Sequence, residues 1–175
     1  MVAALSTDRP RYAAHAATHA DAGARGRELI DRFLTLADRD SEAYAGFAAA
    51  LKLPKDTDEE RLARSAALAA AARVASEVPM ACVEACLELV EAADMLAGRS
   101  NVNAASDVLV AALLGEAAAR GAAENVLINL PSTGDESYSE SMRWQVDALL
   151  HEVAAGAART REFVLSGQSR EPEEA

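Results

Sequence analysis

Two aspartates have the residue type and the position to do chemistry in this chain. Asp40 falls on a run of apolar and aromatic residues whose spacing alternates between four and three, as on the buried face of a helix. The other positions of this seam are Phe33, Ala37, Tyr44, Phe47 and Leu51. A carboxylate on a buried face is costly unless it is paired or takes part in function. Asp40 is therefore expected either to reach solvent or a buried arginine, or to serve a ligand.

Asp107 lies near the start of a long apolar segment, one turn after Asn103. On a helix it shares a face with Val110, Ala111 and Leu114, and we therefore expect it to point inward. One interpretation is an acid that complements the positive end of the helix dipole. The other is a buried, ionised carboxylate that stabilises a cationic ligand.

Four asparagines flank the same apolar segment. Asn101 and Asn103 precede it, and Asn125 and Asn129 follow it. Each side-chain amide offers a donor and an acceptor, so the group could recognise a heterocycle. Capping and turn formation are the alternative, with Asn103 the expected N-cap.

The cysteines and histidines give weaker signals. Cys82 and Cys86 are four residues apart among apolar neighbours, and buried thiols are the favoured interpretation over metal or redox chemistry. His15 and His19 have the same spacing, but no glutamate or third histidine accompanies them as in a zinc-protease motif. We expect solvated histidines and no metal site.

The composition predicts the elements that must position these residues. Of the 175 residues 51% are hydrophobic but only 4% are aromatic, so the core is built from Ala, Leu and Val. Small residues allow helices to pack closely, and Ala has the highest helix propensity, which predicts an all-α bundle. The net charge of −11 argues against nucleic acid and anionic membrane surfaces as partners. With no apolar run of bilayer length and no signal-peptide pattern, a cytoplasmic location is expected.

We expect a single domain over residues 1–166 and a disordered acidic tail over 167–175. Predicted helices span 11–51, 58–97 and 104–123, and a final one spans 138–165 with Trp144 and Val153 facing inward. Thr57 and Glu60 form a predicted capping box, Pro79 should kink or split the second helix, and Gly98 should end it. The third helix is apolar all round and is expected to be the central rod, covered on every side. Residues 125–130 are predicted to be extended.

In the aspartates, asparagines and turns described above, the chain resembles the cyclodeaminase/cyclohydrolase family. This family includes the cyclodeaminase domain of formiminotransferase-cyclodeaminase and bacterial methenyltetrahydrofolate cyclohydrolases. The resemblance covers essentially the whole chain, and its matching stretches are 38–64, 76–85 and 98–131. Its most specific parts are Asp40 with Ala43-Tyr44, the Leu53-Pro54-Lys55 turn, and the block from Asn101 to Leu130 that holds Asp107 and the four asparagines.

The resemblance implies an up-and-down bundle of long, kinked helices that forms a homodimer, with folate in a groove near the subunit interface. It implies an enzyme that cyclises 5-formiminotetrahydrofolate with loss of ammonia, or hydrolyses 5,10-methenyltetrahydrofolate to the 10-formyl form. Both reactions pass through a tetrahedral carbon between two folate nitrogens. Neutral amides and carboxylates suit a cationic intermediate. No cofactor or metal is implied.

By this resemblance Asp107 and Asp40 are the catalytic acid/base and electrostatic pair. Asn101, Asn103, Asn125, Asn129 and Tyr44 are substrate-binding candidates. Lys55 either meets the folate glutamate tail or is a solvated turn residue.

The chain departs from the family pattern at its start. Family members begin with a helix preceded by a glycine-rich loop that helps form the substrate site, whereas MVAALSTDRP looks like the tail of that helix. We therefore expect a truncated first helix. The alternative function is a catalytically inactive helical dimer that binds folate or serves as a scaffold.

Overall fold

The computed structural model describes residues 1–172, and within them the chain is entirely helical apart from its connections. The long helices are α2 (Ala16–Leu51), α3 (Asp58–Leu96), α4 (Ala105–Asn129) and α5 (Glu136–Ser166). A short helix, α1 (Val2–Ser6), precedes them. Short 3-10 turns connect them: η1 (Pro10–His15), η2 (Val102–Ala104) and η3 (Leu130–Thr133). The all-α prediction is confirmed.

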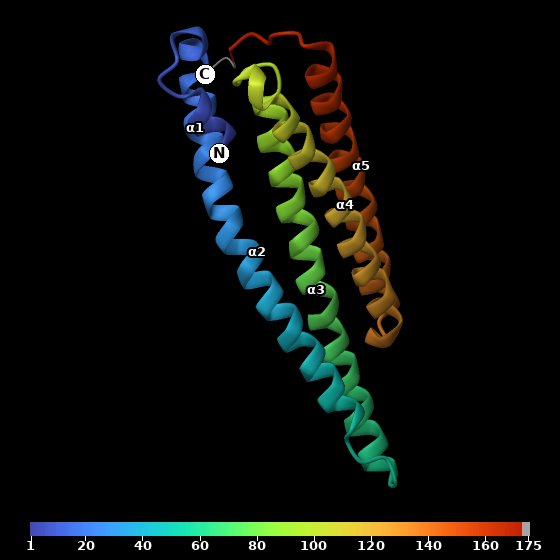
Figure 1. The fold of residues 1–175 in the computed structure, drawn as a ribbon. Helices are drawn as coiled ribbons and strands as arrows, with labels where there is room; N and C mark the ends of the chain where they lie inside the picture. The colour runs from blue at the N-terminus through green and yellow to red at the C-terminus, as the bar shows by residue number, and fades with distance from the viewer. Residues whose placement is uncertain (173–175) are drawn as a thin grey trace.

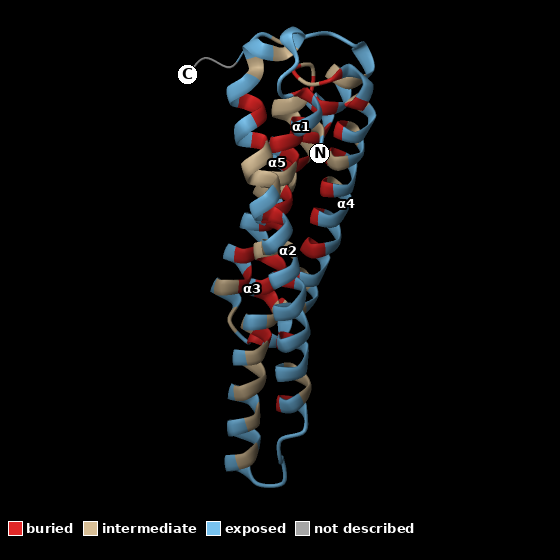
Figure 2. Ribbon diagram, turned by 60° about the vertical axis from the view of Figure 1, so that its left-hand side comes forward, coloured by how far each residue is buried: buried red, intermediate tan, exposed pale blue. Residues whose placement is uncertain are grey.

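Helix α3 is the element around which the others pack. Helices α2, α4 and α5 all pack against α3, whereas α2 and α4 hardly touch each other (Figure 1). The α2–α3 hairpin extends well beyond the lower end of α4 and α5, and the buried residues are concentrated where all the long helices overlap (Figure 2). The prediction that the segment after Gly98 is the central rod is therefore wrong.

The core depends on a close approach of three helices at one valine. Val90 of α3 is fully buried, and a Cβ built on Gly115 of α4 or on Gly156 of α5 would lie 2.8 Å from a Val90 methyl group. Each glycine admits a different methyl of the same side chain. Because the χ1 rotamer of a helical valine is strongly restricted, Val90 cannot move aside for either neighbour. Two glycines thus set how closely α4 and α5 pack against α3.

The buried face of α2 is displaced from the predicted seam. Its buried apolar residues repeat every seven positions, at Leu29, Leu36, Ala43 and Ala50. Phe33 and Phe47 are partly buried beside this stripe, but Tyr44 is 75% exposed. Four of the six predicted seam positions are therefore exposed, because aromatic and apolar residues occur on more than one face of this helix.

Helix α4 buries only one of its faces. That face carries Val108, Ala112, Gly115, Ala119 and Val126, while Val110, Leu113 and Leu114 on the opposite side are exposed. The helix also continues to Asn129, through Gly121 and the segment predicted to be extended. Of the apolar residues in this segment, Val126 and Leu130 are fully buried in the core, whereas Ile128 is 75% exposed.

Helix α3 begins as predicted. Thr57 accepts a hydrogen bond from the Glu60 N–H and the Glu60 carboxylate accepts from the Thr57 N–H, so both halves of the capping box are present. Pro79 lies inside α3 without dividing it. The helix ends at Leu96, followed by Gly98 in a left-handed conformation.

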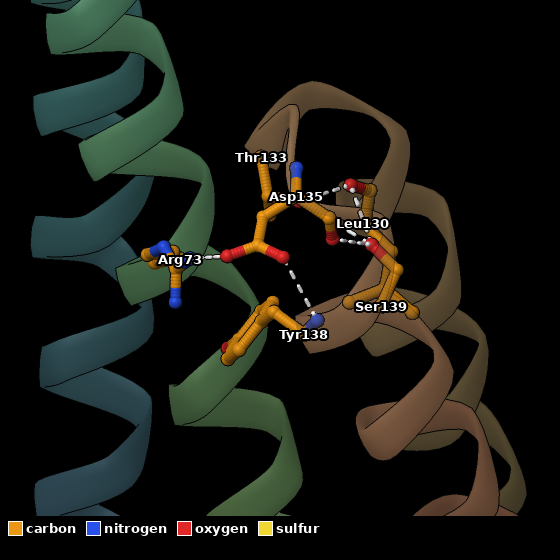
Figure 3. A network of polar contacts seen from close by, with 6 residues as sticks. All are labelled: Arg73, Leu130, Thr133, Asp135, Tyr138 and Ser139. Atoms are coloured by element: carbon orange, nitrogen blue, oxygen red, sulfur yellow. Dashed lines mark hydrogen bonds and ion pairs between the residues drawn. The ribbon is translucent and has the colours of Figure 1, made fainter.

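A polar network joins the start of α5 to α3 (Figure 3). Asp135 caps α5 by accepting the Tyr138 N–H at 3.0 Å, and its carboxylate pairs with Arg73 of α3. The Arg73 guanidinium also stacks 4.2 Å from the Tyr138 ring centre. The Tyr138 N–H, and after it Arg73, hold the pKa of Asp135 below its ordinary value. Further along α5, Val153 is buried as predicted, but Trp144 is 73% exposed and its predicted inward position is wrong.

Both ends of the described chain lie toward the same end of the bundle, and the C-terminal segment crosses that end (Figure 1). Arg170 pairs with Asp94 of α3, and its N–H donates to the Gly98 carbonyl at 3.0 Å. The predicted acidic tail is described only as far as Pro172, and residues 173–175 lie outside the described residues.

Two helical stretches, α3 and Val102–Thr133, are long and apolar enough to cross a membrane by length and composition alone. This differs from the expectation that no apolar run has that length. Both stretches contribute buried residues to the core of the bundle.

Substituting two glycines of α4 tests the close approach at Val90. Gly121→Ala has open space around the new methyl group and should raise the free energy of unfolding by about 0.5–1 kcal/mol through helix propensity. Gly115→Ala meets Val90 and should lower the free energy of unfolding by roughly 1–2 kcal/mol despite the same propensity gain. Urea unfolding at one protein concentration measures both. Equal effects of the two substitutions would contradict the packing described here.

Candidate functional site

Two hollows lie over α3, between α2 and α4. The larger, which we call the Asp107 cavity, has a volume of about 580 Å³ and is formed by α1, residues 19–30 of α2, residues 89–96 of α3 and residues 107–111 of α4. The smaller, the Asp40 groove, has a volume of about 290 Å³ and lies farther along the same helices. Both exist because α2 and α4 pack on α3 without closing on each other.

Asp107 lies in the first turn of α4 with an exposed side chain, and lines the larger cavity. The prediction that it points into the core is wrong, because the face it shares with Val110 and Leu114 is the open side of α4. The N-terminal turn of a helix still favours a negative charge at this position. The cavity wall otherwise consists mainly of apolar residues, so this carboxylate is one of few charged groups there.

Asp40 lines the Asp40 groove, also with an exposed side chain. Asn125 of α4 and Cys82 of α3 line the same groove, together with the apolar wall residues Phe33, Leu36 and Val78. Asp40 and Asp107 therefore line different hollows, so the two acids that the resemblance implies as a catalytic pair do not meet in one cavity of the chain. The reason is their position along two helices that run in the same direction (Figure 1), since Asp107 lies at the start of α4 whereas Asp40 lies in the second half of α2, beside the second half of α4.

Asn101 and Asn129 use their amides within the chain. Asn101 is buried, accepts the Asn103 N–H at 3.1 Å and donates to the Leu5 carbonyl at 3.3 Å, which ties α1 to the α3–α4 connection. Asn129 donates to the carbonyls of Ala75 and Asn125, each at 2.8 Å. These bonds are structural, while a role for either side chain in binding substrate stays a prediction.

The remaining predicted residues lie away from both hollows. Asn103 is exposed in η2, and the N-cap position of α4 is taken by Ala104 instead. Tyr44 is exposed on α2, and Lys55 is exposed in the α2–α3 turn at the far end of the hairpin. Neither Tyr44 nor Lys55 lines the Asp107 cavity or the Asp40 groove.

Sequence reasoning missed two residues of the Asp107 cavity, His19 and Arg27. His19 was expected to be solvated, yet its side chain is only 3% exposed and its Nε2 lies 2.9 Å from the Arg99 carbonyl oxygen. Arg27 lies beside Gly23 and Gly26, in the stretch of α2 with the weakest helical pattern. The small residues in this stretch could have indicated the cavity from the sequence, because small side chains leave space between helices.

The two histidines do not form a metal centre within residues 1–172. Their ring centres are 6.4 Å apart, and the described chain contains no cluster of three or more His, Cys, Asp or Glu side chains suited to a metal ion. Burial, the neighbouring His19 and the Arg99 charge lower the pKa of His15.

The cysteine pair has one buried and one accessible member. Cys86 is fully buried, as expected, whereas Cys82 is partly exposed at the Asp40 groove. A hydrogen bond from the Cys86 thiol lowers the pKa of Cys82 to about 7, against the opposing effects of burial and of Asp40. The same contact and burial raise the pKa of Cys86. Cys82 thus has substantial thiolate character at neutral pH.

Comparison with known proteins gives a consistent result. A family model described as formiminotransferase-cyclodeaminase matches residues 1–148. The chain is 38% identical over 141 residues to methenyltetrahydrofolate cyclohydrolase of Methylorubrum extorquens, covering 79% of this chain and 67% of that protein. It is 38% identical over 127 residues to formimidoyltransferase-cyclodeaminase of Sus scrofa, covering 73% of this chain but only 24% of that protein. The crystal structure of formiminotetrahydrofolate cyclodeaminase from Thermotoga maritima aligns with a TM-score of 0.84 at 25% identity, over 95% of this chain and 79% of that one.

Alkylation of Cys82 by iodoacetamide tests the electrostatics of the Asp40 groove. The rate should rise with pH around a midpoint of about 7. Cys86→Ala removes the hydrogen-bond donor, so the pKa of Cys82 should rise and the rate at pH 7 should fall roughly tenfold as the thiolate fraction drops. Asp40→Asn is the matched control, because removing the nearby negative charge should increase the rate. A Cys86→Ala rate equal to that of the wild type would contradict the assignment.

Proposed function

The chain belongs to the formiminotransferase-cyclodeaminase family, and from this membership we propose that it is an enzyme acting on the one-carbon bridge between N5 and N10 of tetrahydrofolate. The candidate reactions are cyclisation of the 5-formimino form with loss of ammonia and hydrolysis of the 5,10-methenyl form. Proteins named for each reaction are among its relatives. The methenyl species, a delocalised cation, takes part in both reactions.

The Asp107 cavity is the single observation that locates the proposed active site. Its volume of about 580 Å³ lies within the range typical of small-molecule sites. Apolar walls from α1, α2, α3 and α4 suit a flat ring system. The Asp107 carboxylate would stabilise the positive charge of the methenyl bridge and of the transition states that lead to or from it.

Arg27 gives the same cavity a positively charged side chain. Folates carry a glutamate tail, and a guanidinium is well suited to bind its carboxylates. We propose Arg27 for this role in place of Lys55, which lies in the α2–α3 turn and lines neither hollow. Asp40 and Asn125 line the smaller groove, and their catalytic and binding roles stay predictions.

We also propose that the protein forms a homodimer through the open side of the bundle. Large apolar side chains are exposed there on both helices beside the Asp107 cavity: Ile30 and Leu34 on α2, and Val110 and Leu114 on α4. Exposed apolar groups of this size in neighbouring turns are typical of association surfaces. A partner on this side would lie next to the Asp107 cavity and would narrow its opening.

Turnover of the two folates tests the proposed reaction. The folded chain should hydrolyse 5,10-methenyltetrahydrofolate or release ammonia from 5-formiminotetrahydrofolate, and measuring both products decides between hydrolase and deaminase. Asp107→Asn removes the negative charge with little change of shape and should lower kcat/KM by at least about 100-fold. Asp147→Asn, on the exposed side of α5, is the control and should leave the rate unchanged. Absence of both reactions in the folded wild-type chain would overturn the proposal.

Sedimentation of a surface variant tests the homodimer. Leu114→Glu places a charge on the exposed apolar side of α4 and should convert the dimer to a monomer at micromolar concentration. Leu165→Glu, at an exposed site near the end of α5, should leave the mass unchanged. A wild-type chain that sediments as a monomer, or a Leu114→Glu variant that remains dimeric, would rule out this interface.

A further inference from the structure

We propose that His19 is the proton acceptor of the Asp107 cavity and that it acts through its Nδ1 atom. This inference rests on the proposed function, which it extends by one named group. Three observations support it: the position of the ring in the cavity wall, the hydrogen bond that fixes its tautomer, and the absence of a partner for Nδ1 in the described chain.

The His19 ring separates two hollows. It lines the Asp107 cavity on one side and a hollow of about 320 Å³ formed by the α1–α2 connection on the other. The ring is held in the first turn of α2 and is 97% shielded, since only 3% of the residue is exposed. Together with Asp107 and Arg27, it is one of three titratable side chains that line the larger cavity.

The hydrogen bond to Arg99 determines which ring nitrogen is basic. Nε2 of His19 lies 2.9 Å from the Arg99 carbonyl oxygen, and a carbonyl oxygen can only accept. Nε2 therefore carries the proton. In the neutral ring, Nδ1 then presents a lone pair.

Nδ1 is buried and has no hydrogen-bond partner among the described residues. Leaving a buried polar atom unpaired is costly, and most such atoms in proteins are satisfied. The nearest histidine offers no compensation, because the His15 ring centre is 6.4 Å away and the His15 Nδ1 also lacks a partner. No described residue supplies that donor, and a ligand N–H or a water molecule would have to reach the His19 Nδ1 from the cavity that the ring lines.

The backbone that orients the ring is itself anchored. The Arg99 side chain donates to the carbonyls of Met95 and Glu171, which ties the α3–α4 turn to the C-terminal segment. A histidine can act as a general base when a hydrogen bond to one ring nitrogen fixes its orientation and leaves the other nitrogen basic. His19 has this arrangement.

The chemistry is written for hydrolysis of the methenyl bridge. A water oxygen attacks the bridge carbon, a C–O bond forms, and the electron pair of the cationic C=N bond moves onto nitrogen. The Nδ1 atom of His19 takes the proton lost by the water. The C–N5 bond then breaks, N5 gains a proton and the new hydroxyl loses one, which gives the 10-formyl product and one proton released overall. The carboxylate of Asp107 stabilises the cation throughout.

Replacing His19 by glutamine separates the two functions of the ring. The glutamine amide can still donate to the Arg99 carbonyl, but it offers no basic nitrogen. His19→Gln should therefore lower kcat by at least about 100-fold, leave the affinity for the unreactive analogue 5-formyltetrahydrofolate within threefold, and retain the unfolding temperature. His15→Gln is the control, since His15 lines neither the Asp107 cavity nor the Asp40 groove, and should turn over normally.

Nitrogen NMR of the wild-type ring gives a second test that does not depend on turnover or on the folding of a variant. The proposal predicts a His19 ring protonated at Nε2 in the free protein, and an Nδ1 signal that shifts on addition of 5-formyltetrahydrofolate. A ring protonated at Nδ1, or a His19→Gln variant with kcat within twofold of the wild type, would overturn the role of His19 and leave the proposed function intact. A folded wild-type chain that turns over neither folate would overturn both.

Discussion

The packing of Val90 between Gly115 and Gly156 is the constraint on which the rest of the structure depends. It brings α4 and α5 so close to α3 that their buried faces can be built from alanine and valine. Helix α2 packs on another side of α3 through its seven-residue stripe of Leu29, Leu36 and Ala43. Because α4 is bound to α3 in this way, it does not close on α2, and the two hollows remain between them.

This arrangement assigns different environments to the two acids. Asp107 lies at the positive end of α4 in the larger cavity, with His19 and Arg27 as its titratable companions. Asp40 lies in the smaller groove, where its charge opposes ionisation of the Cys82 thiol. The Asp107 cavity thus combines the proposed proton acceptor, a carboxylate and a guanidinium within apolar walls. This set suits a cationic, carboxylate-bearing substrate better than the pair of acids alone.

The sequence predicted the elements better than their faces. The capping box at Thr57 and the end of α3 near Gly98 were predictable because local hydrogen bonding and backbone conformation decide them. The inward orientation of Asp107 and Trp144 was wrong, because an alanine-rich helix has apolar residues on several faces and periodicity does not identify the buried one. His19 was missed for another reason: its partner is a backbone carbonyl 80 residues away, which no local pattern encodes. The family likeness was recognisable because its motifs recur in order along the chain.

A crystal structure of the protein with 5-formyltetrahydrofolate tests the central claim most directly, since that claim is the location of the site. The account predicts the pterin ring in the Asp107 cavity, with the N5–N10 region near the Asp107 carboxylate and the His19 ring, and the glutamate tail toward Arg27. A folate bound in the Asp40 groove, or on the α5 side of the bundle with the Asp107 cavity empty, would contradict it.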